Sequence, residues 1–185
     1  MKRVCVFFAD GTEECEALLV VDILRRAKIE VVTASINGTT QVCSSHAITL
    51  QTDATVEQVQ NQMFDAVVVP GGLPGTTHLA AHPIVKEMCV SHAKAGKLVA
   101  AICAAPSALA QFGLLEGVHA TAHAGFIDKL AGAVVVQQPV VVDGNITTGW
   151  GLGAAIPFAL SLVEQLLDQQ IADSIANAIG YANLH

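Results

Sequence analysis

Cys103 lies where an apolar run meets a stretch of helix-forming residues. Residues 97–103 read KLVAAIC, and residues 104–112 read AAPSALAQF. This pattern predicts a buried strand that turns sharply into a helix, with Pro106 in the first helical turn. A side chain at such a turn, a nucleophile elbow, points out of the sheet toward the positive end of the helix, which favours the reactive thiolate. We therefore predict that Cys103 is a nucleophile.

The other four of the five cysteines have no such position. Free cysteine is commonly a core residue, so we expect these to be buried structural residues. They are Cys5, Cys15, Cys43 and Cys89.

Three loops are predicted to meet at Cys103, because sites in a parallel sheet form beyond the carboxyl ends of its strands. They are residues 9–16, 70–75 and 102–105. The first loop places one of Glu13, Glu14 and Glu16 close to the sulfur, and the other two are expected to be solvated residues of a first helical turn. In the second loop, Gly71 and Gly72 are expected to present the backbone N–H groups that an oxyanion hole requires.

A reactive thiolate needs more than the helix end. An ordinary cysteine, with a pKa of about 8.5, is only a few per cent ionised at pH 7, and a pKa lower by about 2–3 requires roughly 3–4 kcal/mol. A helix N-terminus contributes about 0.3–1 kcal/mol and at most ~2. A charge-assisted hydrogen bond contributes about 1.5–3 kcal/mol. We therefore expect a second donor at Cys103, a carboxyl group that burial keeps protonated.

The elements that position these loops alternate along the chain. Apolar runs predict strands at 4–8, 30–35, 66–69, 98–102, 134–136, 140–142 and 145–148, with a more polar β excursion at 41–44 and 47–51. Helical spacing predicts helices at 13–28, 56–62, 83–95, 104–112 and 153–168, and a short C-terminal one. This alternation predicts an α/β fold with right-handed βαβ units and a mostly parallel sheet.

Composition limits the possible classes of protein. Residues 1–185 have the length of a single domain, and with 52% hydrophobic and 14% charged residues they can build a large core. With a net charge of −7 and nine Lys plus Arg, nucleic acid is not expected as a partner. An odd number of cysteines and the absence of a long apolar run predict a soluble, cytoplasmic protein.

Four motifs together resemble the ThiJ/PfpI superfamily, and within it the branch of the parkinsonism-associated deglycase. They are ADGTEECE at 9–16, VVDILRRA at 20–27, VVVPGG at 67–72 and AAICAAP at 100–106. The resemblance implies a flavodoxin-like three-layer sandwich with helices on both faces, a homodimer and an easily oxidised nucleophilic cysteine. It assigns the protonated carboxyl to Glu16 and the oxyanion donors to the loop with Gly71 and Gly72, and it places His123 near Cys103.

The chain departs from related patterns at several places, among them Ser45-His46, where the branch often has Arg after Cys43-Ser44. Ala104 follows Cys103, whereas the protease-like branch has a Cys-His pair at this point, so peptidase activity is not expected. No His-x-Glu motif follows as it does in glutamine amidotransferases, so amidotransferase activity is not expected either. The late glycine loop, usually preceded by Arg or Gln, reads Trp150-Gly151-Leu152-Gly153, which predicts a more apolar pocket rim.

Three functions fit these residues. In the first, Cys103 attacks a small reactive carbonyl such as methylglyoxal, glyoxal or an early adduct, the N–H groups of Gly72 and Ala104 hold the oxyanion, and Glu16 shuttles the proton with His123. This glyoxalase or deglycase reaction requires no cofactor and no metal. In the second, Cys103 is an oxidative-stress sensor or part of a redox-regulated chaperone, oxidised to a sulfinate. The third is a binding module with an incidental thiol.

Overall fold

A mostly parallel sheet forms the centre of the molecule. The computed structural model describes residues 1–184, and its seven-stranded sheet has the order β10-β11-β7-β6-β1-β2-β5. All neighbouring strands are parallel except β10 and β11. The strands of this sheet are β1 (Arg3–Phe8), β2 (Glu30–Ser35), β5 (Ala54–Thr55), β6 (Ala66–Val69), β7 (Leu98–Ile102), β10 (Val140–Asp143) and β11 (Ile146–Gly149).

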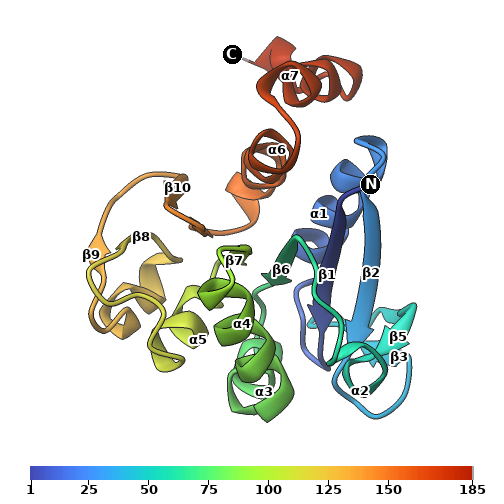
Figure 1. Cartoon of the computed structure of the whole chain (residues 1–185), viewed down its shortest axis with the longest axis vertical. Coiled ribbons are helices and arrows are strands. Elements are labelled where there is room, and N and C mark those ends of the chain that lie inside the picture. The colour runs from blue at the N-terminus through green and yellow to red at the C-terminus, as the bar shows by residue number, and fades with distance from the viewer. Residues whose placement is uncertain (185) are drawn as a thin grey trace.

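Helices cover both faces of the sheet and form the outer layers of an α/β sandwich. Alternate residues of β1 point to opposite faces, so Val4 and Val6 join one core cluster and Cys5 and Phe7 join the other. The first face is covered by α1 (Glu14–Arg26), α6 (Ala155–Leu166) and α7 (Gln169–Ala178). The second is covered by α2 (Val56–Val59), α3 (Gly75–Ala81), α4 (Pro83–Lys94) and α5 (Pro106–Gln111). Figure 1 shows α6 and α7 at the opposite end of the view from α3 and α4.

Smaller elements lie outside the main sheet. The predicted β excursion is the antiparallel hairpin of β3 (Gln41–Cys43) and β4 (Thr49–Gln51). A second pair consists of β8 (His119–Ala120) and β9 (Val134–Val135). Three 3₁₀ helices complete the described chain, at η1 (Ala124–Lys129), η2 (Leu152–Ala154) and η3 (Tyr181–Leu184).

The strand order brings the three predicted loops together. β7, β6 and β1 are consecutive in the sheet and parallel, so their carboxyl ends, Ile102, Val69 and Phe8, lie at the same edge. The segments that follow these strands therefore meet there, as the alternation of strands and helices predicted. Within the described residues, no helix combines the length and the apolar character that a membrane span requires.

Candidate active site

Cys103 lies at a tight turn between β7 and α5. Its φ is +65°, a left-handed conformation that is uncommon for a residue with a Cβ and typical of a nucleophile elbow. The turn is fixed on both sides, because the Cys103 N–H donates to the Gly149 carbonyl and the Cys103 carbonyl accepts from the His123 N–H, each at 2.8 Å. Pro106 is at the first position of α5, as predicted. The side chain is partly exposed, so small molecules reach the sulfur.

Glu16 is the glutamate that lies beside the sulfur. It lies in the first turn of α1, where the Glu13 carboxylate caps the helix by accepting from the Glu16 N–H at 2.6 Å. The Glu16 residue is only 1% exposed, and its carboxyl hydrogen-bonds to the Cys103 thiol. Two backbone groups also donate to this carboxyl, the N–H of Gly71 at 3.2 Å and the N–H of Leu152.

The two acids hold a proton between them near neutral pH. Burial raises the pKa of the Glu16 carboxyl to about 7. Burial, and then the negative charge of Glu16, raise the pKa of the Cys103 thiol to about 12. This differs from the expectation of a lowered thiol pKa, because that expectation counted the helix end and a protonated carboxyl but neither the burial of the thiol nor a negative charge on Glu16. The pair therefore loses its first proton near neutrality and keeps the second to high pH.

Backbone donors also surround the sulfur. The N–H groups of Gly72 and Ala104 hydrogen-bond to it and act to lower the thiol pKa. Gly72 has a φ of +94°, which a residue with a Cβ rarely adopts. The N–H of Gly71 does not match the expected oxyanion role, because it donates to Glu16 instead.

Gly71 matters for a different reason, which is space. A Cβ built at Gly71 would collide with Glu16 Oε2 and would lie 2.6 Å from the Cβ of Cys103. The absence of a side chain at this position therefore allows the carboxyl and the thiol to approach one another.

His123 lies at the mouth of the site. With Gly72, Leu73, Ala104 and Phe126 it lines a pocket of about 300 Å³ that opens onto Cys103. Its Nδ1 accepts from the Gly125 N–H at 3.2 Å, so Nε2 is the ring nitrogen that can donate. The ring therefore offers a donor in the same pocket as Cys103.

Glu14 faces away from the thiol, toward the β3–β4 hairpin. Its carboxylate accepts from Ser45 Oγ at 3.3 Å and lies 2.8 Å from His46 Nδ1. One donor atom from each of Glu13, Glu14 and His46 lies within 4.8 Å of the other two, a spacing that a metal ion could use. The donors are already engaged, since Glu13 caps α1 and Glu14 pairs with His46.

The other cysteines divide into two classes. Cys5 and Cys89 are buried, as predicted, and burial raises the pKa of both thiols. Cys15 and Cys43 are exposed, so the expectation that they are core residues was wrong. The helical period of α1 places Cys15 on its solvent side, and the two-residue period of β3 places Cys43 at an outward position.

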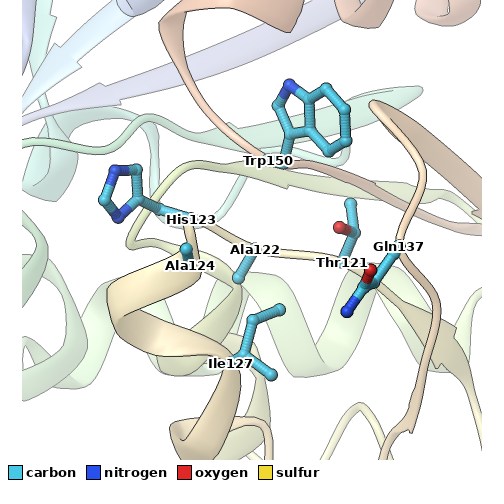
Figure 2. A pocket seen from close by; sticks show the side chains of 7 residues that line it. All are labelled: Thr121, Ala122, His123, Ala124, Ile127, Gln137 and Trp150. Atoms are coloured by element: carbon cyan, nitrogen blue, oxygen red, sulfur yellow. The ribbon is translucent and has the colours of Figure 1, made fainter.

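A larger pocket adjoins the Cys103 pocket and shares His123 with it. It has a volume of about 420 Å³, and its lining includes Ala122, Ile127, Gln137 and Trp150. Figure 2 shows His123 at one end of this pocket and Gln137 at the other, with the Trp150 indole on one side. The site as a whole offers a thiol, a proton carrier, backbone donors and space for a small substrate.

A comparison with known proteins places this arrangement in a family. A sequence model described as the DJ-1/PfpI family matches residues 2–165. The Drosophila melanogaster protein dj-1beta is 36% identical over 96% of both chains. The Caenorhabditis elegans protein named glutathione-independent glyoxalase DJR-1.2 is 31% identical over 90% of this chain and 89% of its own. The Arabidopsis thaliana DJ-1 homolog A is 37% identical over 96% of this chain, which spans 46% of that longer protein.

Solved structures agree with the sequence comparison. A DJ-1 superfamily protein of Salmonella typhimurium, solved as a Cys-to-Ala mutant, has a TM-score of 0.93 and 40% identity, with 97% of this chain and 98% of that chain covered. Toxoplasma gondii DJ-1, described as oxidized, has a TM-score of 0.94 and 36% identity, also with 97% of this chain and 98% of that chain covered. The flavodoxin-like fold is therefore that of these proteins, and the chain belongs to the DJ-1/PfpI family.

Proposed function

We propose that this protein is a cofactor-independent glyoxalase that converts small 2-oxoaldehydes to 2-hydroxy acids, with Cys103 as the nucleophile. The observation that carries the proposal is the buried Glu16 carboxyl hydrogen-bonded to a partly exposed thiol at the base of a pocket. A carboxyl whose pKa is raised to about 7 is suited to take and return protons at neutral pH. The name of the Caenorhabditis elegans relative supports the same reaction.

The first step is addition to the aldehyde. Sγ of Cys103 bonds to the aldehyde carbon while the thiol proton passes to the Glu16 carboxylate. The electron pair of the C=O bond moves onto oxygen, where the N–H groups of Gly72 and Ala104 stabilise the developing charge. Glu16 then returns the proton to this oxygen, which gives a hemithioacetal and restores the carboxylate.

The second step is an internal transfer of hydrogen. Glu16 moves the proton of the former aldehyde carbon to the neighbouring carbon through an enediol, and His123 relays the hydroxyl proton to the neighbouring oxygen. One carbon is oxidised and the other reduced, so no external oxidant or reductant is consumed. The product is a 2-hydroxyacyl thioester on Cys103.

The third step is hydrolysis. Water adds to the thioester carbonyl, the C–S bond breaks, and the sulfur leaves as the thiol with one proton from water. For methylglyoxal the balance is one methylglyoxal plus one water to one lactic acid. Early adducts of the same aldehydes on amines or thiols enter the same path when Sγ replaces the amine or thiol: the C–S bond to Cys103 forms, the bond to the adduct nitrogen or sulfur breaks, and the thiol proton goes to the leaving group. We therefore include deglycase activity in the proposal.

Steady-state kinetics on methylglyoxal and glyoxal test the proposal. The wild-type protein is expected to consume both aldehydes with saturation, whereas Cys103→Ser is expected to be inactive because a hydroxyl is a far weaker nucleophile beside Glu16. Cys15→Ser is the matched control, since this exposed thiol lies outside the pocket. Equal rates for wild type and Cys103→Ser would overturn the proposal.

A second candidate function is that of a redox sensor or redox-regulated chaperone. It is favoured by the accessible, donor-lined sulfur of Cys103, and the oxidized state in the description of the Toxoplasma gondii relative is consistent with it. Two molecules of hydrogen peroxide would convert the thiolate to a sulfinate with release of two waters. Peptide mass analysis after a peroxide titration tests this, because oxidation of the exposed Cys15 and Cys43 ahead of Cys103 would contradict it.

A further inference from the structure

The pocket beside Trp150 is the neighbour of the pocket that contains the reactive sulfur. His123 lines both this pocket and the Cys103 pocket. A Cβ built at Gly151 would lie 3.7 Å from His123 Cδ2 and 3.9 Å from Cys103 Sγ, so the backbone that carries Trp150 passes next to the thiol. A substituent on a carbon bound to Sγ would pass Gly151 on its way to the indole.

The lining of this pocket is suited to a flat, neutral group. The side chains of Ala122, Ile127 and Trp150 supply apolar surface, and Gln137 supplies an amide at the end farthest from His123 (Figure 2). Trp150 is 42% exposed, so a large part of its indole is free to contact a ligand. The lining residues include no Lys, Arg, Asp or Glu, so a phosphorylated or otherwise ionic substituent finds no counter-charge there.

The pocket walls are held in place by backbone hydrogen bonds. The Thr121 N–H donates to Thr148 Oγ1 at 2.9 Å, and the Trp150 N–H donates to the Pro139 carbonyl at 3.1 Å. The volume of about 420 Å³ is well above the roughly 150 Å³ that is known to accommodate benzene in an apolar protein cavity. The methyl group of methylglyoxal would leave most of this space to water.

We propose that this pocket is a subsite for the aryl substituent of aromatic 2-oxoaldehydes, so that phenylglyoxal is a better substrate than methylglyoxal because its ring packs against Trp150. The inference rests on the proposed glyoxalase function and names the substrate class that the site prefers. The chemistry is unchanged: one phenylglyoxal plus one water gives one mandelic acid.

Kinetics test the subsite through a ratio. The ratio of kcat/KM for phenylglyoxal to that for methylglyoxal is expected to fall at least about tenfold in Trp150→Ala, and to stay within about threefold of wild type in Trp150→Phe, which keeps an aromatic face. Met63→Ala is the matched control, an exposed apolar residue that does not line the pocket, and it should leave the ratio unchanged. An unchanged ratio in Trp150→Ala, with both aldehydes still consumed, would overturn the subsite and leave the glyoxalase proposal intact.

Fluorescence tests binding without any turnover. Trp150 is the single tryptophan of the chain, so indole emission reports on this pocket directly. Acetophenone, an aryl ketone without an aldehyde, is expected to change the emission of the wild-type protein in a saturable way, whereas acetone is not. Ala124→Phe, which adds a ring at an exposed position of the lining, should abolish saturation. Loss of emission that is linear in acetophenone concentration would overturn the proposal, even if neither aldehyde is a substrate.

Discussion

The carboxyl of Glu16 hydrogen-bonds to the thiol of Cys103, although the two residues come from α1 and from the turn after β7. Four backbone N–H groups surround this pair, those of Gly71 and Leu152 at the carboxyl and those of Gly72 and Ala104 at the sulfur. Donors on both sides stabilise one negative charge on the pair, wherever its remaining proton is. This arrangement suits a reaction in which a proton moves repeatedly between sulfur, oxygen and carbon.

Glu16→Gln is expected to lower kcat/KM for methylglyoxal by about 10²–10⁴, the usual contribution of a positioned acid–base group. Glutamine keeps the shape and can accept from Gly71, but it does not take a proton from the thiol. Labelling of Cys103 by iodoacetamide should continue, which separates loss of proton transfer from loss of the nucleophile.

Glu14→Gln is the matched control for that variant, because Glu14 belongs to the same helical turn and contacts Ser45 and His46 instead of the sulfur. Its kcat/KM should stay close to that of wild type. Equal losses in Glu14→Gln and Glu16→Gln would show that the assignment of Glu16 is wrong.

The pH dependence of kcat/KM should follow the first ionisation of the Glu16–Cys103 pair. Because burial raises the pKa of Glu16 to about 7, the carboxylate that accepts the thiol proton is largely absent below this pH. The rate constant should therefore rise with pH and level off above an apparent pKa near 7. A profile that is already flat at pH 5 would disagree with this assignment.

Glu16 should also make folding stability depend on pH. A carboxyl with a pKa raised in the folded state binds its proton more tightly there, so the stabilisation is present at low pH and is lost as the pH rises from 4.5 to about 7. The rise in the Glu16 pKa from 4.5 to about 7 corresponds to about 3 kcal/mol in the free energy of unfolding. In urea unfolding, Glu16→Gln should therefore gain stability relative to wild type at pH 8 but not at pH 4. If the difference in stability between Glu16→Gln and wild type did not depend on pH, the raised pKa of the buried carboxyl would be contradicted.

Gly71→Ala should reduce activity strongly, because its Cβ would collide with Glu16 Oε2 and press on Cys103. Such overpacking typically costs about 1–3 kcal/mol of stability. Gly153→Ala offers a matched control, since nothing lies within 4 Å of the Cβ position of Gly153. The comparison is made by kcat/KM and by thermal unfolding, and wild-type activity in Gly71→Ala would show that the close approach of Glu16 and Cys103 is unnecessary.

We also predict a homodimer in solution. Leu18 on α1 is 43% exposed and Ile48 at the hairpin is 48% exposed, and both are large apolar side chains that a second copy would cover. Light scattering at micromolar protein should give twice the sequence mass. A monomer at these concentrations would contradict the prediction.

Much of the sheet could be predicted from the sequence. The strands at 30–35, 66–69 and 98–102 were predicted with their observed bounds, because each is a short apolar run between clear turn signals. The helix Gly75–Ala81 was missed, since it begins in a loop rich in glycine and proline and has no apolar repeat of its own. Strands of two residues, such as Ala54–Thr55, are too short to produce a periodic pattern.

The side chains of the site could be predicted, but its backbone donors only in part, since Gly72 and Ala104 were expected at the sulfur and Leu152 was not. Cys103 was named from its turn, whereas Glu16 and His123 were named from the family resemblance, and in the structure Glu16 lies beside the sulfur and His123 lines the same pocket as Cys103. The donor at Leu152 was missed, because every residue except proline carries an N–H and the sequence does not show which of them point inward. The role of Gly71 was misassigned for the same reason.

The formation of lactate tests the central claim most directly. Methylglyoxal is incubated with wild-type protein and with Cys103→Ser, and lactate is quantified by proton NMR. The account predicts one lactate for each methylglyoxal consumed by the wild-type protein, and no lactate above the buffer rate with Cys103→Ser. Equal lactate formation by both proteins, or consumption of methylglyoxal by the wild type without lactate, would contradict a cysteine-dependent glyoxalase.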